Sequence, residues 1–460
     1  MISNLPSTPA DALDISWAYR LKINIVLILA RIFRFWDYPD KKTATDFEEM
    51  SSRDIYYWVH KTTNPITRPE KGERILDMLM TDNSVVGLPQ DFEKQNSLTM
   101  AAGGDLLYPQ GNEYEKDFLF ENVADLLFDQ DVSFMSLESP VTTQKLVKEI
   151  ISNKAAPTEC CSREQFNILK GHKGKCFTVM NTANNHTFDL GIEGMETTRK
   201  IFAENDILNV GVNSRPDEFG QGQILIRNGI KLGFVSATFG LNGHKLPAGE
   251  NYRINVSKLS SKFIEPELGL LKQQIDYCKN QQCDFIIASP HWGWEFECFP
   301  RKKQIEAAHR LVELGADAII ASHPHVIQPV EYYRTQRDPN RIAIIAYSMG
   351  SLTWGYSAPY LVLSLILNLT LSKGTLQGND LTYIEKASVS PVFRSSFNSG
   401  GKMVTRIEKL TDHLDGLSKN HPQEYITEIK RYADLVLGEY GFSDKKLKDS
   451  VDIKPTKVAA

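Results

Sequence analysis

The sequence predicts an α/β fold with helical additions at both ends. Between residues 98 and 346, short apolar runs alternate with amphipathic helical patterns, whereas both ends of the chain carry mainly helical periodicity. Strands that alternate with helices indicate a largely buried sheet covered by helices. We therefore expect a helical N-terminal extension (1–95), one main α/β domain (96–400) and a C-terminal helical segment (401–460).

The expected strands are runs of four or five mostly apolar residues. They lie at 98–102, 132–135, 176–180, 231–235, 285–288, 318–321 and 342–346, and strand-like runs without intervening helices follow at 361–371 and 387–393. The clearest helices span 192–204 and 302–314, the second with Gly315 as a C-terminal stop. Helical periodicity also covers 46–61, 72–80 and the stretch from about 403 to 446.

The most apolar stretch, residues 23–35, is interrupted by Arg31. It is too short to cross a bilayer, which takes roughly 20 apolar residues, so we expect no transmembrane span. As a helix it gathers Ile25, Ile28, Leu29 and Ile32 on one stripe. A helix packed on the main domain is favoured over a membrane-surface anchor.

The composition is that of an ordinary globular protein, with 42% hydrophobic residues and a formal net charge of -5. That charge offers no general basic surface, so we expect no nucleic-acid partner. The six cysteines form no CxxC pair, which favours reduced thiols. Since the N-terminus also lacks the order of a secretory signal, we expect a cytoplasmic location.

Five of the expected strands are each followed by an acidic, asparagine or histidine residue. These residues are Asp105, Glu138, Asn185 with His186, His291, and His323 with His325. In open α/β sheets, functional residues gather beyond the carboxyl ends of strands. Each residue alone has an ordinary explanation as a turn cap, a loop carboxylate or a core histidine. The repetition of the position predicts a divalent-metal centre.

The mixture of ligands narrows the metal and the chemistry. Imidazole with carboxylate and amide oxygen suits Zn, Mn or Fe, and sulfur is absent from the set. In His323-Pro324-His325 the proline holds two imidazoles on alternate sides of an extended segment, where they can face two ions or one ion twice. Two ions about 3.5–4 Å apart would activate water and polarise a phosphoryl or carbonyl oxygen. We keep His244 and Trp292 as substrate contacts, although core packing explains Trp292 equally well.

Five ordered blocks covering roughly residues 98–355 resemble the CapA family, the poly-γ-glutamate capsule branch of the calcineurin-like metallophosphoesterases. They read GGDLLYP, SLESPVT, TANNHTFDLGIEGMETTRKIF, SPHWGWEFECFP continued by RKKQIEAAHRLVELGADAIIASHPHVIQPVE, and AYSMGSLTWG. The resemblance implies a four-layer αββα sandwich. It also implies that the metals lie at strand ends between two sheets.

The resemblance further implies a role for each site residue. Asp105 and His325 would serve one metal, with Glu138 as the bridge. Asn185, His291 and His323 would serve the other. The remaining implied roles are an acid or charge-stabilising histidine (His186), support of the histidines from behind (Asp189, Glu295) and a substrate contact near the site (Tyr347).

Some positions depart from the family pattern. The superfamily usually begins with Asp-x-His, but Leu107 stands where that histidine is expected. Ser136 and Ser351 each replace a usual asparagine. Members of the capsule type normally carry an N-terminal membrane span, and none is visible in this sequence. These departures leave the occupancy of the first metal position open.

Three functions fit these observations. The first is a metal-dependent hydrolase or transferase that acts on a phosphoryl or acyl/γ-glutamyl bond, linked to poly-γ-glutamate capsule synthesis. The second is a soluble peptide epimerase in which His186, paired with His291 or His325, exchanges a Cα proton. The third is a non-catalytic accessory subunit of a polymer synthase. The expected substrate is a polymer, peptide or phosphoester, and a peripheral membrane or synthase partner stays open.

Overall fold

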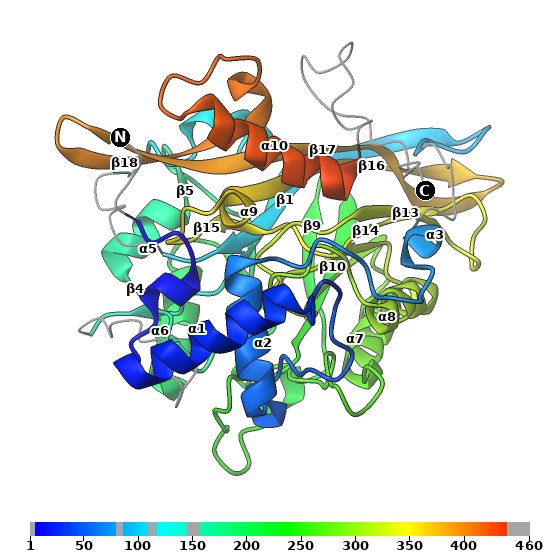
Figure 1. Cartoon of the computed structure of the whole chain (residues 1–460). Helices are drawn as coiled ribbons and strands as arrows, with labels where there is room; N and C mark the ends of the chain where they lie inside the picture. The colour runs from blue at the N-terminus through cyan, green and yellow to red at the C-terminus, as the bar shows by residue number, and fades with distance from the viewer. Residues whose placement is uncertain (1–4, 80–85, 109–114, 116, 145–156, 439–460) are drawn as a thin grey trace.

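The computed structural model describes residues 5–79, 86–108, 115, 117–144 and 157–438 (Figure 1). The larger of its two main sheets has the order β18-β17-β16-β1-β2-β7-β8, and β15 pairs with β1 beside this path. Its strands are β1 (Glu93–Leu106), β2 (Val132–Leu137), β7 (Val179–Asn181), β8 (Leu208–Val210), β15 (Ser351–Thr353), β16 (Leu363–Leu376), β17 (Asn379–Ser399) and β18 (Lys402–Lys409).

The smaller main sheet has the order β13-β14-β12-β11-β10-β9. Its strands are β9 (Gln223–Arg227), β10 (Ile230–Thr238), β11 (Phe285–His291), β12 (Ala318–Ile320), β13 (Val330–Arg334) and β14 (Ile342–Ala346). Two further sheets of two strands each pair β3 (Val141–Thr142) with β4 (Cys161–Ser162) and β5 (Gly171–His172) with β6 (Lys175–Cys176). The central strands of both main sheets run parallel, which brings their carboxyl ends to one edge.

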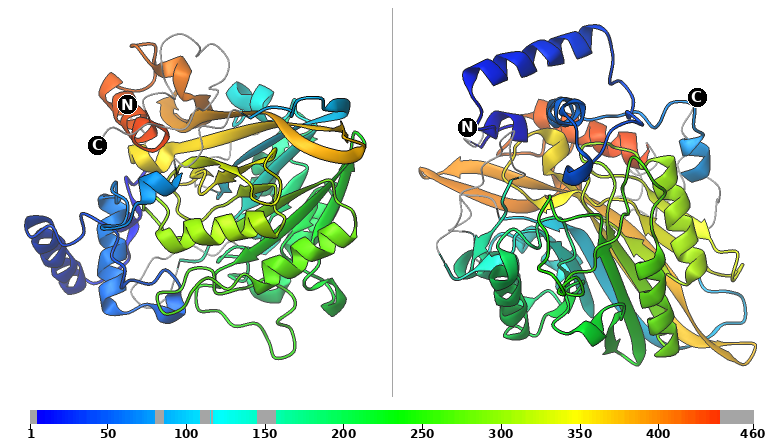
Figure 2. Two further views of the ribbon diagram at one scale, coloured as in Figure 1. Left: turned by 90° about the vertical axis from the view of Figure 1, so that its right-hand side faces the viewer. Right: turned by 90° about the horizontal axis from the view of Figure 1, so that it is seen from below.

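The two main sheets pack face to face, and helices cover both outer surfaces. Phe134 of β2 stacks on Phe234 of β10 with ring centroids 5.8 Å apart, inside one continuous core. The larger sheet is covered by α4 (Ala124–Leu127), α5 (Arg163–Leu169) and α6 (Gly191–Ala203), and the smaller by α7 (Gly269–Asn280) and α8 (Lys302–Leu314). The layers are visible in Figure 2. The expected four-layer αββα sandwich is confirmed.

The burial of individual strands and helices agrees with the sequence patterns that predicted them. Strands β2, β11 and β14 are buried along their whole length, as expected for apolar runs covered on both faces. Helix α8 buries the predicted stripe that includes Ile305 and Leu311, and it ends at Gly315, whose φ is 132°. Glycine tolerates this left-handed backbone without the clash that a Cβ would cause.

The C-terminal part departs from the expected helical texture. Residues Lys402–Lys409 form β18, which pairs antiparallel with β17, so the expectation of helix from residue 403 is wrong for this stretch. Pairing with the long β17 outweighs a weak helical pattern. Helix follows only at η5 (Leu410–His413) and α10 (Gln423–Leu437), and residues 439–460 lie outside the described residues. The bounds of the three parts of the chain stay a prediction.

The short remaining elements complete the chain. They are η3 (Glu121–Val123), η4 (Pro216–Glu218) and α9 (Pro359–Val362), and in the N-terminal extension η1 (Pro9–Ala12), α1 (Trp17–Ile32), η2 (Phe47–Glu49), α2 (Ser52–Thr63) and α3 (Ile75–Leu79). The predicted helix at 72–80 corresponds to α3, and Met80 lies outside the described residues. Among the helices that the structure describes, none combines the length and apolar character needed to cross a membrane.

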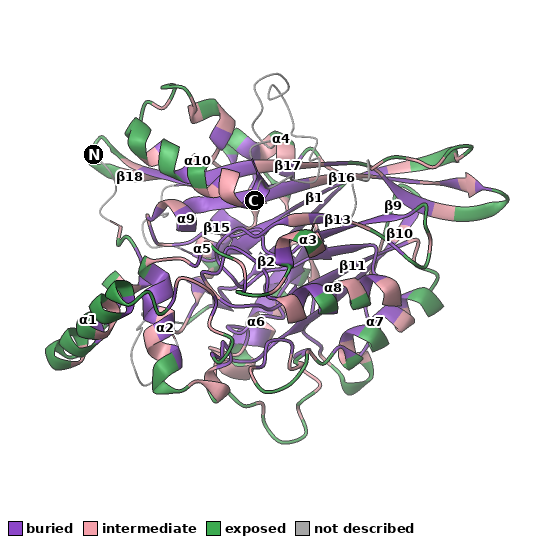
Figure 3. Ribbon diagram, turned by 45° about the vertical axis from the view of Figure 1, so that its right-hand side comes forward, coloured by how far each residue is buried: buried purple, intermediate pink, exposed green. Residues whose placement is uncertain are grey.

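Helix α1 corrects the expectation for its apolar stripe. Ile25, Ile28, Leu29 and Ile32 are 43–65% exposed, whereas Ile23 and Ala30 on the opposite side are buried. The helix is apolar on two sides, and the Ile23 side is the one that packs with Val59 of α2. Figure 3 shows α1 as a largely exposed helix at the edge of the molecule. The predicted packing of this stripe on the main domain is therefore wrong.

Candidate metal centre

The strand ends of both sheets bring the predicted metal ligands together. From the larger sheet come Asp105 at the end of β1, Glu138 directly after β2, and Asn185 in the loop that follows β7. From the smaller sheet come His291, the last residue of β11, and the two histidines of the loop after β12, His323 and His325. The expected position, at strand ends between two sheets, is where the structure places these residues.

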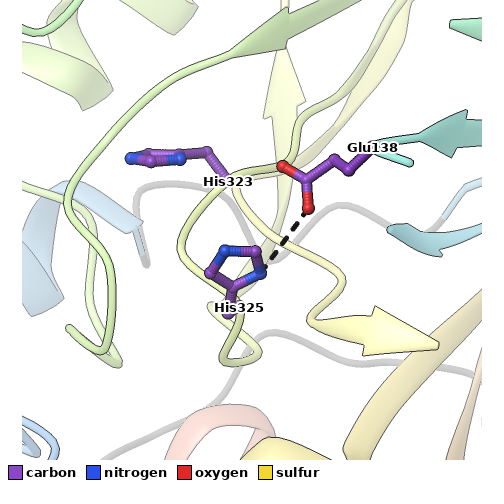
Figure 4. A group of neighbouring side chains, drawn as sticks. All are labelled: Glu138, His323 and His325. Carbon is purple, nitrogen blue, oxygen red and sulfur yellow. Dashed lines mark ion pairs between the residues drawn. The ribbon is translucent and has the colours of Figure 1, made fainter. Parts of the chain in front are cut away.

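Glu138 lies at the centre of the cluster. It belongs to two groups of possible ligands, one with His323 and His325 and one with Asp105 and His291, and within each group the ligand atoms lie within 4.8 Å of one another. Its Oε1 is 2.9 Å from Nε2 of His291, and its Oε2 is 3.7 Å from Nδ1 of His325. Figure 4 shows Glu138 facing the two imidazoles of one loop. Glu138 is therefore the residue that the two groups share.

The grouping of the other ligands differs from the one that the family resemblance implies. His325 falls with His323 rather than with Asp105, and Asp105 falls with His291. Asn185 contacts the group of Asp105 and His291, because its Oδ1 is 2.7 Å from Nε2 of the His291 ring. The backbone N–H of His323 donates to Oδ2 of Asp105 at 3.2 Å, which ties the two groups to each other.

The chemistry of the cluster fits a bound cation. Asp105, Glu138 and His291 are fully buried, and His323 and His325 are nearly so. Within the described residues, neither oxygen of Glu138 accepts a hydrogen bond of good geometry, and Nδ1 of His323 has no partner. Buried polar atoms are costly without a partner. A divalent ion is the partner that would satisfy carboxylate oxygens and imidazole nitrogens together.

The pKa shifts of the cluster also fit a bound cation. Burial, with the nearby Glu138, raises the pKa of Asp105 to about 7, and burial raises the pKa of Glu138 to about 8. Burial lowers the pKa of His291 to about 4 and holds the pKa values of His323 and His325 well below the ordinary range. The histidines are thus neutral, as metal ligands must be, and a cation would stabilise the charged form of the two carboxyls.

Three hydroxyl groups that the sequence reasoning missed orient the imidazoles. Ser322 lies 2.8 Å from Nδ1 of His291, and Ser351 lies 2.9 Å from Nδ1 of His325. Thr45, from the N-terminal extension, lies 3.0 Å from Nε2 of His323. Such contacts fix the ring orientation of metal-binding histidines. In the sequence, Ser322 directly precedes His323, and Ser351 stands where the family pattern has an asparagine. No sequence pattern indicated Thr45.

The loop that carries the two histidines is not extended, contrary to the sequence expectation. His323 has a φ of 101° and His325 a φ of 57°, both in the left-handed region. The backbone N–H of Phe296 donates to the carbonyl of Pro324 at 2.8 Å and helps to hold this conformation. Non-glycine residues with positive φ carry strain that the surrounding structure must offset, and such residues cluster at functional sites.

His186 and Asp189 form a separate pair at the edge of the cluster. Nδ1 of His186 is 2.7 Å from Oδ2 of Asp189, and the backbone N–H of Glu159 donates to the same oxygen at 2.8 Å. Burial alone would lower the pKa of His186, but Asp189 outweighs it and raises that pKa to about 10. The ring is thus held as an imidazolium beside Asn185.

The other predicted site residues differ in whether they contact the ligand cluster. Glu295 accepts from Nε1 of Trp58 at 2.6 Å and lies 3.9 Å from Nε2 of His325, so it contacts that histidine only at long range. The side chain of His244 is 47% exposed, with Nε2 3.8 Å from Asp189. Trp292 is fully buried in the core under α7 and α8, and Tyr347 donates to Glu331 at 2.6 Å. These two side chains stand in the core, so the expected substrate contacts from Trp292 and Tyr347 are corrected.

The surroundings of Asp105 include a close backbone contact at Gly104, the buried side chain of Leu107 and a cavity beside the cluster. A Cβ added to Gly104 would lie 2.1 Å from the carbonyl oxygen of Gly350, the oxygen that accepts from the N–H of Asp105 at 3.0 Å. Only glycine permits this approach. Leu107, which stands in place of the family histidine, is buried in the core between the sheets. A cavity opens beside the cluster, and Asn185, His186 and His323 line it.

Comparison with known proteins finds chains that are similar to this one. The family model described as "Bacterial capsule synthesis protein PGA_cap" matches residues 87–356, which is more than half of the chain. The chain is 27% identical over 274 residues to "Capsule biosynthesis protein CapA" of Bacillus anthracis, covering 58% of this chain and 62% of that protein. It is 27% identical over 298 residues to "PGA biosynthesis protein CapA" of Bacillus subtilis (strain 168), covering 64% of this chain and 71% of that protein. A solved structure of a hypothetical protein from Thermus thermophilus aligns with a TM-score of 0.35 and 12% identity, over 64% of this chain and 99% of that chain.

Proposed function

The chain belongs to the bacterial capsule synthesis protein PGA_cap family, and on this premise we propose that it is a metal-dependent enzyme. Its reaction is hydrolysis or transfer at a phosphoryl or acyl/γ-glutamyl bond, in chemistry linked to a poly-γ-glutamate capsule. The names of the two Bacillus relatives support the link to the capsule. The observation that carries the proposal is Glu138, which is shared by two groups of buried ligands.

The proposed cofactor is a pair of divalent ions, Mn, Zn or Fe. Glu138 would bridge them, with His323 and His325 on one side and Asp105 and His291 on the other. The absence of sulfur ligands and the mixture of imidazole with carboxylate support this choice of metals. Bound ions would polarise the substrate oxygen and lower the pKa of water at the site.

The chain's own residues supply orientation and a proton. Thr45, Ser322 and Ser351 hold the three imidazoles in fixed rotations. Asp189 holds the proton on Nδ1 of His186, so Nε2 is the nitrogen that gives its proton to the leaving group. Because His186 also lines the cavity, the leaving group is expected on that side of the cluster.

Metal analysis together with an activity screen tests the proposal. The purified full chain is assayed for bound Mn, Zn and Fe and against phosphoesters and γ-glutamyl peptides. We expect metal-dependent turnover that is abolished by His323→Ala. The matched control is His309→Ala, because His309 lies on α8 and pairs with Glu331 at 2.8 Å outside both ligand groups.

Three results would contradict the proposal. If the protein bound no metal and added metal changed neither stability nor activity, the accessory-subunit hypothesis would replace it. If Cα deuterium exchange on peptides were the only metal-dependent reaction, the peptide epimerase hypothesis would replace it. Full activity in His323→Ala would remove the site assignment itself.

We also propose that α1 lies on an anionic lipid surface. Its exposed stripe contains Trp17, Leu21, Ile25, Ile28 and Ile32, each at least 46% exposed. Arg20, Lys22 and Arg31 belong to the same helix, which contains no acidic residue although the chain carries a net charge of -5. An apolar face flanked by cations matches the boundary between acyl chains and anionic headgroups. Figure 2 places this helix at the periphery.

Vesicle sedimentation tests this placement. The protein should bind vesicles that contain phosphatidylglycerol, bind phosphatidylcholine vesicles weakly, and dissociate partly at high salt. The double variant Ile25→Glu/Ile28→Glu should lose binding, whereas Phe263→Glu, at another exposed apolar position, should not. A wild-type protein that ignores vesicles but dimerises through α1 would show that the face is covered by a second copy.

A further inference from the structure

The cavity beside the metal centre is lined by two chemically different groups of residues. The polar group consists of Asn185, His186, Glu295 and His323 of the candidate site, with Asn242, whose Oδ1 accepts from Nδ2 of Asn185 at 3.1 Å. The apolar group, called the apolar wall below, comes mainly from the N-terminal extension, with Ile23, Phe47, Met50, Trp58 and Val59 among its residues. The extension thus contributes this wall to the site in addition to its contact with His323 through Thr45.

The apolar wall reaches the metal ligands directly. The ring of Phe239, which also lines the cavity, lies 4.4 Å from the ring of His323, centroid to centroid. The extension is anchored at the same place through the contact of Thr45 with His323 and of Trp58 with Glu295. A group bound at His323 would therefore have the apolar residues of this cavity beside it.

The volume and the charge of the cavity limit what it can hold. Its volume is about 110 Å³. An apolar protein cavity of roughly 150 Å³ holds benzene, so a branched aliphatic group or one small ring is the appropriate size. The described lining residues include no lysine or arginine. The cation among the lining residues is His186, which belongs to the polar group, so the apolar residues offer a charged substituent no counter-ion of their own.

We propose that the N-terminal extension forms a specificity pocket for a small apolar substituent, of four to six carbons, attached directly to the phosphoryl or acyl group that reacts. This inference rests on the proposed function, because it places the reacting group at the metal centre. It narrows the substrate to molecules with an anionic or polar head and a compact apolar group beside it.

Binding of matched phosphonates to the Mn²⁺-loaded full chain tests the pocket without turnover. Methylphosphonate and n-butylphosphonate carry the same anionic head and differ by three methylene groups. Burial of one methylene strengthens binding about fourfold, so butylphosphonate should bind at least tenfold and up to roughly 50-fold more tightly by calorimetry. Benzene, which has no anionic head, is followed in parallel by ligand-observed NMR.

A pair of variants locates the effect. Phe47→Asn/Met50→Gln makes the wall polar without adding charge, and it should reduce the butyl-to-methyl ratio below about threefold while methylphosphonate affinity is unchanged. Ile226→Asn, at an exposed position on β9, should leave the ratio as in the wild type. Retention of the wild-type ratio in the Phe47/Met50 variant would place the apolar contact elsewhere and overturn the proposal.

The probes separate failure of the pocket from failure of the proposed function. Equal affinities for the two phosphonates, with no benzene binding, overturn the pocket and leave the metal centre intact. Benzene binding without binding of either phosphonate supports an apolar pocket but refutes an anion-binding metal centre. If no probe binds, both proposals are overturned.

Discussion

Replacement of Glu297 should loosen the attachment of the N-terminal extension to the sandwich. This carboxylate is 1% exposed and accepts hydrogen bonds from the hydroxyl of Tyr57 at 3.0 Å, from Nζ of Lys61 at 3.3 Å and from the guanidinium of Arg301 at 2.8 Å. Tyr57 and Lys61 lie on α2, and Arg301 is the N-cap of α8. One buried carboxylate thus joins the extension to the segment between β11, which ends at His291, and α8.

The expected magnitude follows from the charges left behind. In Glu297→Gln the side chains of Lys61 and Arg301, which are 4% and 5% exposed, stay buried without their counter-ion. Removal of one partner of a buried ion pair typically costs about 3–5 kcal/mol. Since glutamine keeps the shape and one acceptor, we expect a loss of about 3 kcal/mol in the first urea-unfolding transition. Asp77→Asn, which breaks an exposed pair with Arg74, should cost less than about 1 kcal/mol.

The effect should also depend on pH. Burial alone would raise the pKa of Glu297, but Arg301 and Lys61 outweigh it and hold that pKa below its ordinary value of 4.5. A carboxyl with a depressed pKa in the folded protein stabilises it above the unfolded pKa, and this stabilisation is lost as the pH falls through the folded value. The stability gap between wild type and Glu297→Gln should therefore be full above about pH 4.5 and close at lower pH. A gap below about 1 kcal/mol at neutral pH, equal to that of Asp77→Asn, would refute the reasoning.

Three further changes give equally direct tests. Gly104→Ala forces a Cβ to within 2.1 Å of the Gly350 carbonyl oxygen, so it should lower the free energy of unfolding by about 1–3 kcal/mol and displace Asp105. Thermal unfolding measures the first effect and metal titration the second. The control is Gly87→Ala, whose Cβ meets open space. Thr45→Val removes the contact with Nε2 of His323 and should weaken metal binding about tenfold in a competition titration. The control Thr427→Val, on α10, should leave metal affinity unchanged. Equal metal affinities of the two variants would show that Thr45 does not support the centre. Asp189→Asn removes the negative charge that holds the proton on His186 Nδ1, so it should lower kcat by about 10–100-fold with metal content unchanged. An unaltered kcat would exclude this pair from the reaction.

The sequence predicts most of the sandwich and the place of its metal centre for one physical reason. Apolar runs buried on both faces are readable as strands, and parallel strands end at a common edge. Glu138 and His291 could therefore be expected to meet although they are far apart in the sequence, and they lie 2.9 Å apart. Lys402–Lys409 was misjudged because its strand state comes from pairing with β17 and not from its own pattern.

What the sequence does not predict are contacts made by common residue types over long separations. Thr45 reaches His323 across most of the chain, and a threonine in a turn-rich stretch carries no signal of such a role. The backbone conformation of His323 and His325 is equally hidden, because positive φ at a histidine is imposed by the surrounding packing. The exposed side of α1 was misassigned because both of its sides are apolar, and only the packing on α2 decides between them.

Helix α1 has one further consequence, because it takes part in two surfaces at once. Its inner side places Tyr19 and Ile23 in the wall of the cavity, while its outer side presents Ile25 and Ile28 to the surroundings. A ligand that fills the cavity and a body that covers the outer side would each restrict the same helix. Thermodynamic reciprocity then requires that each changes the affinity of the other by the same factor. Ligand binding in the cavity and binding of the outer side of α1 to a surface would thus be coupled equilibria, because both involve the same helix.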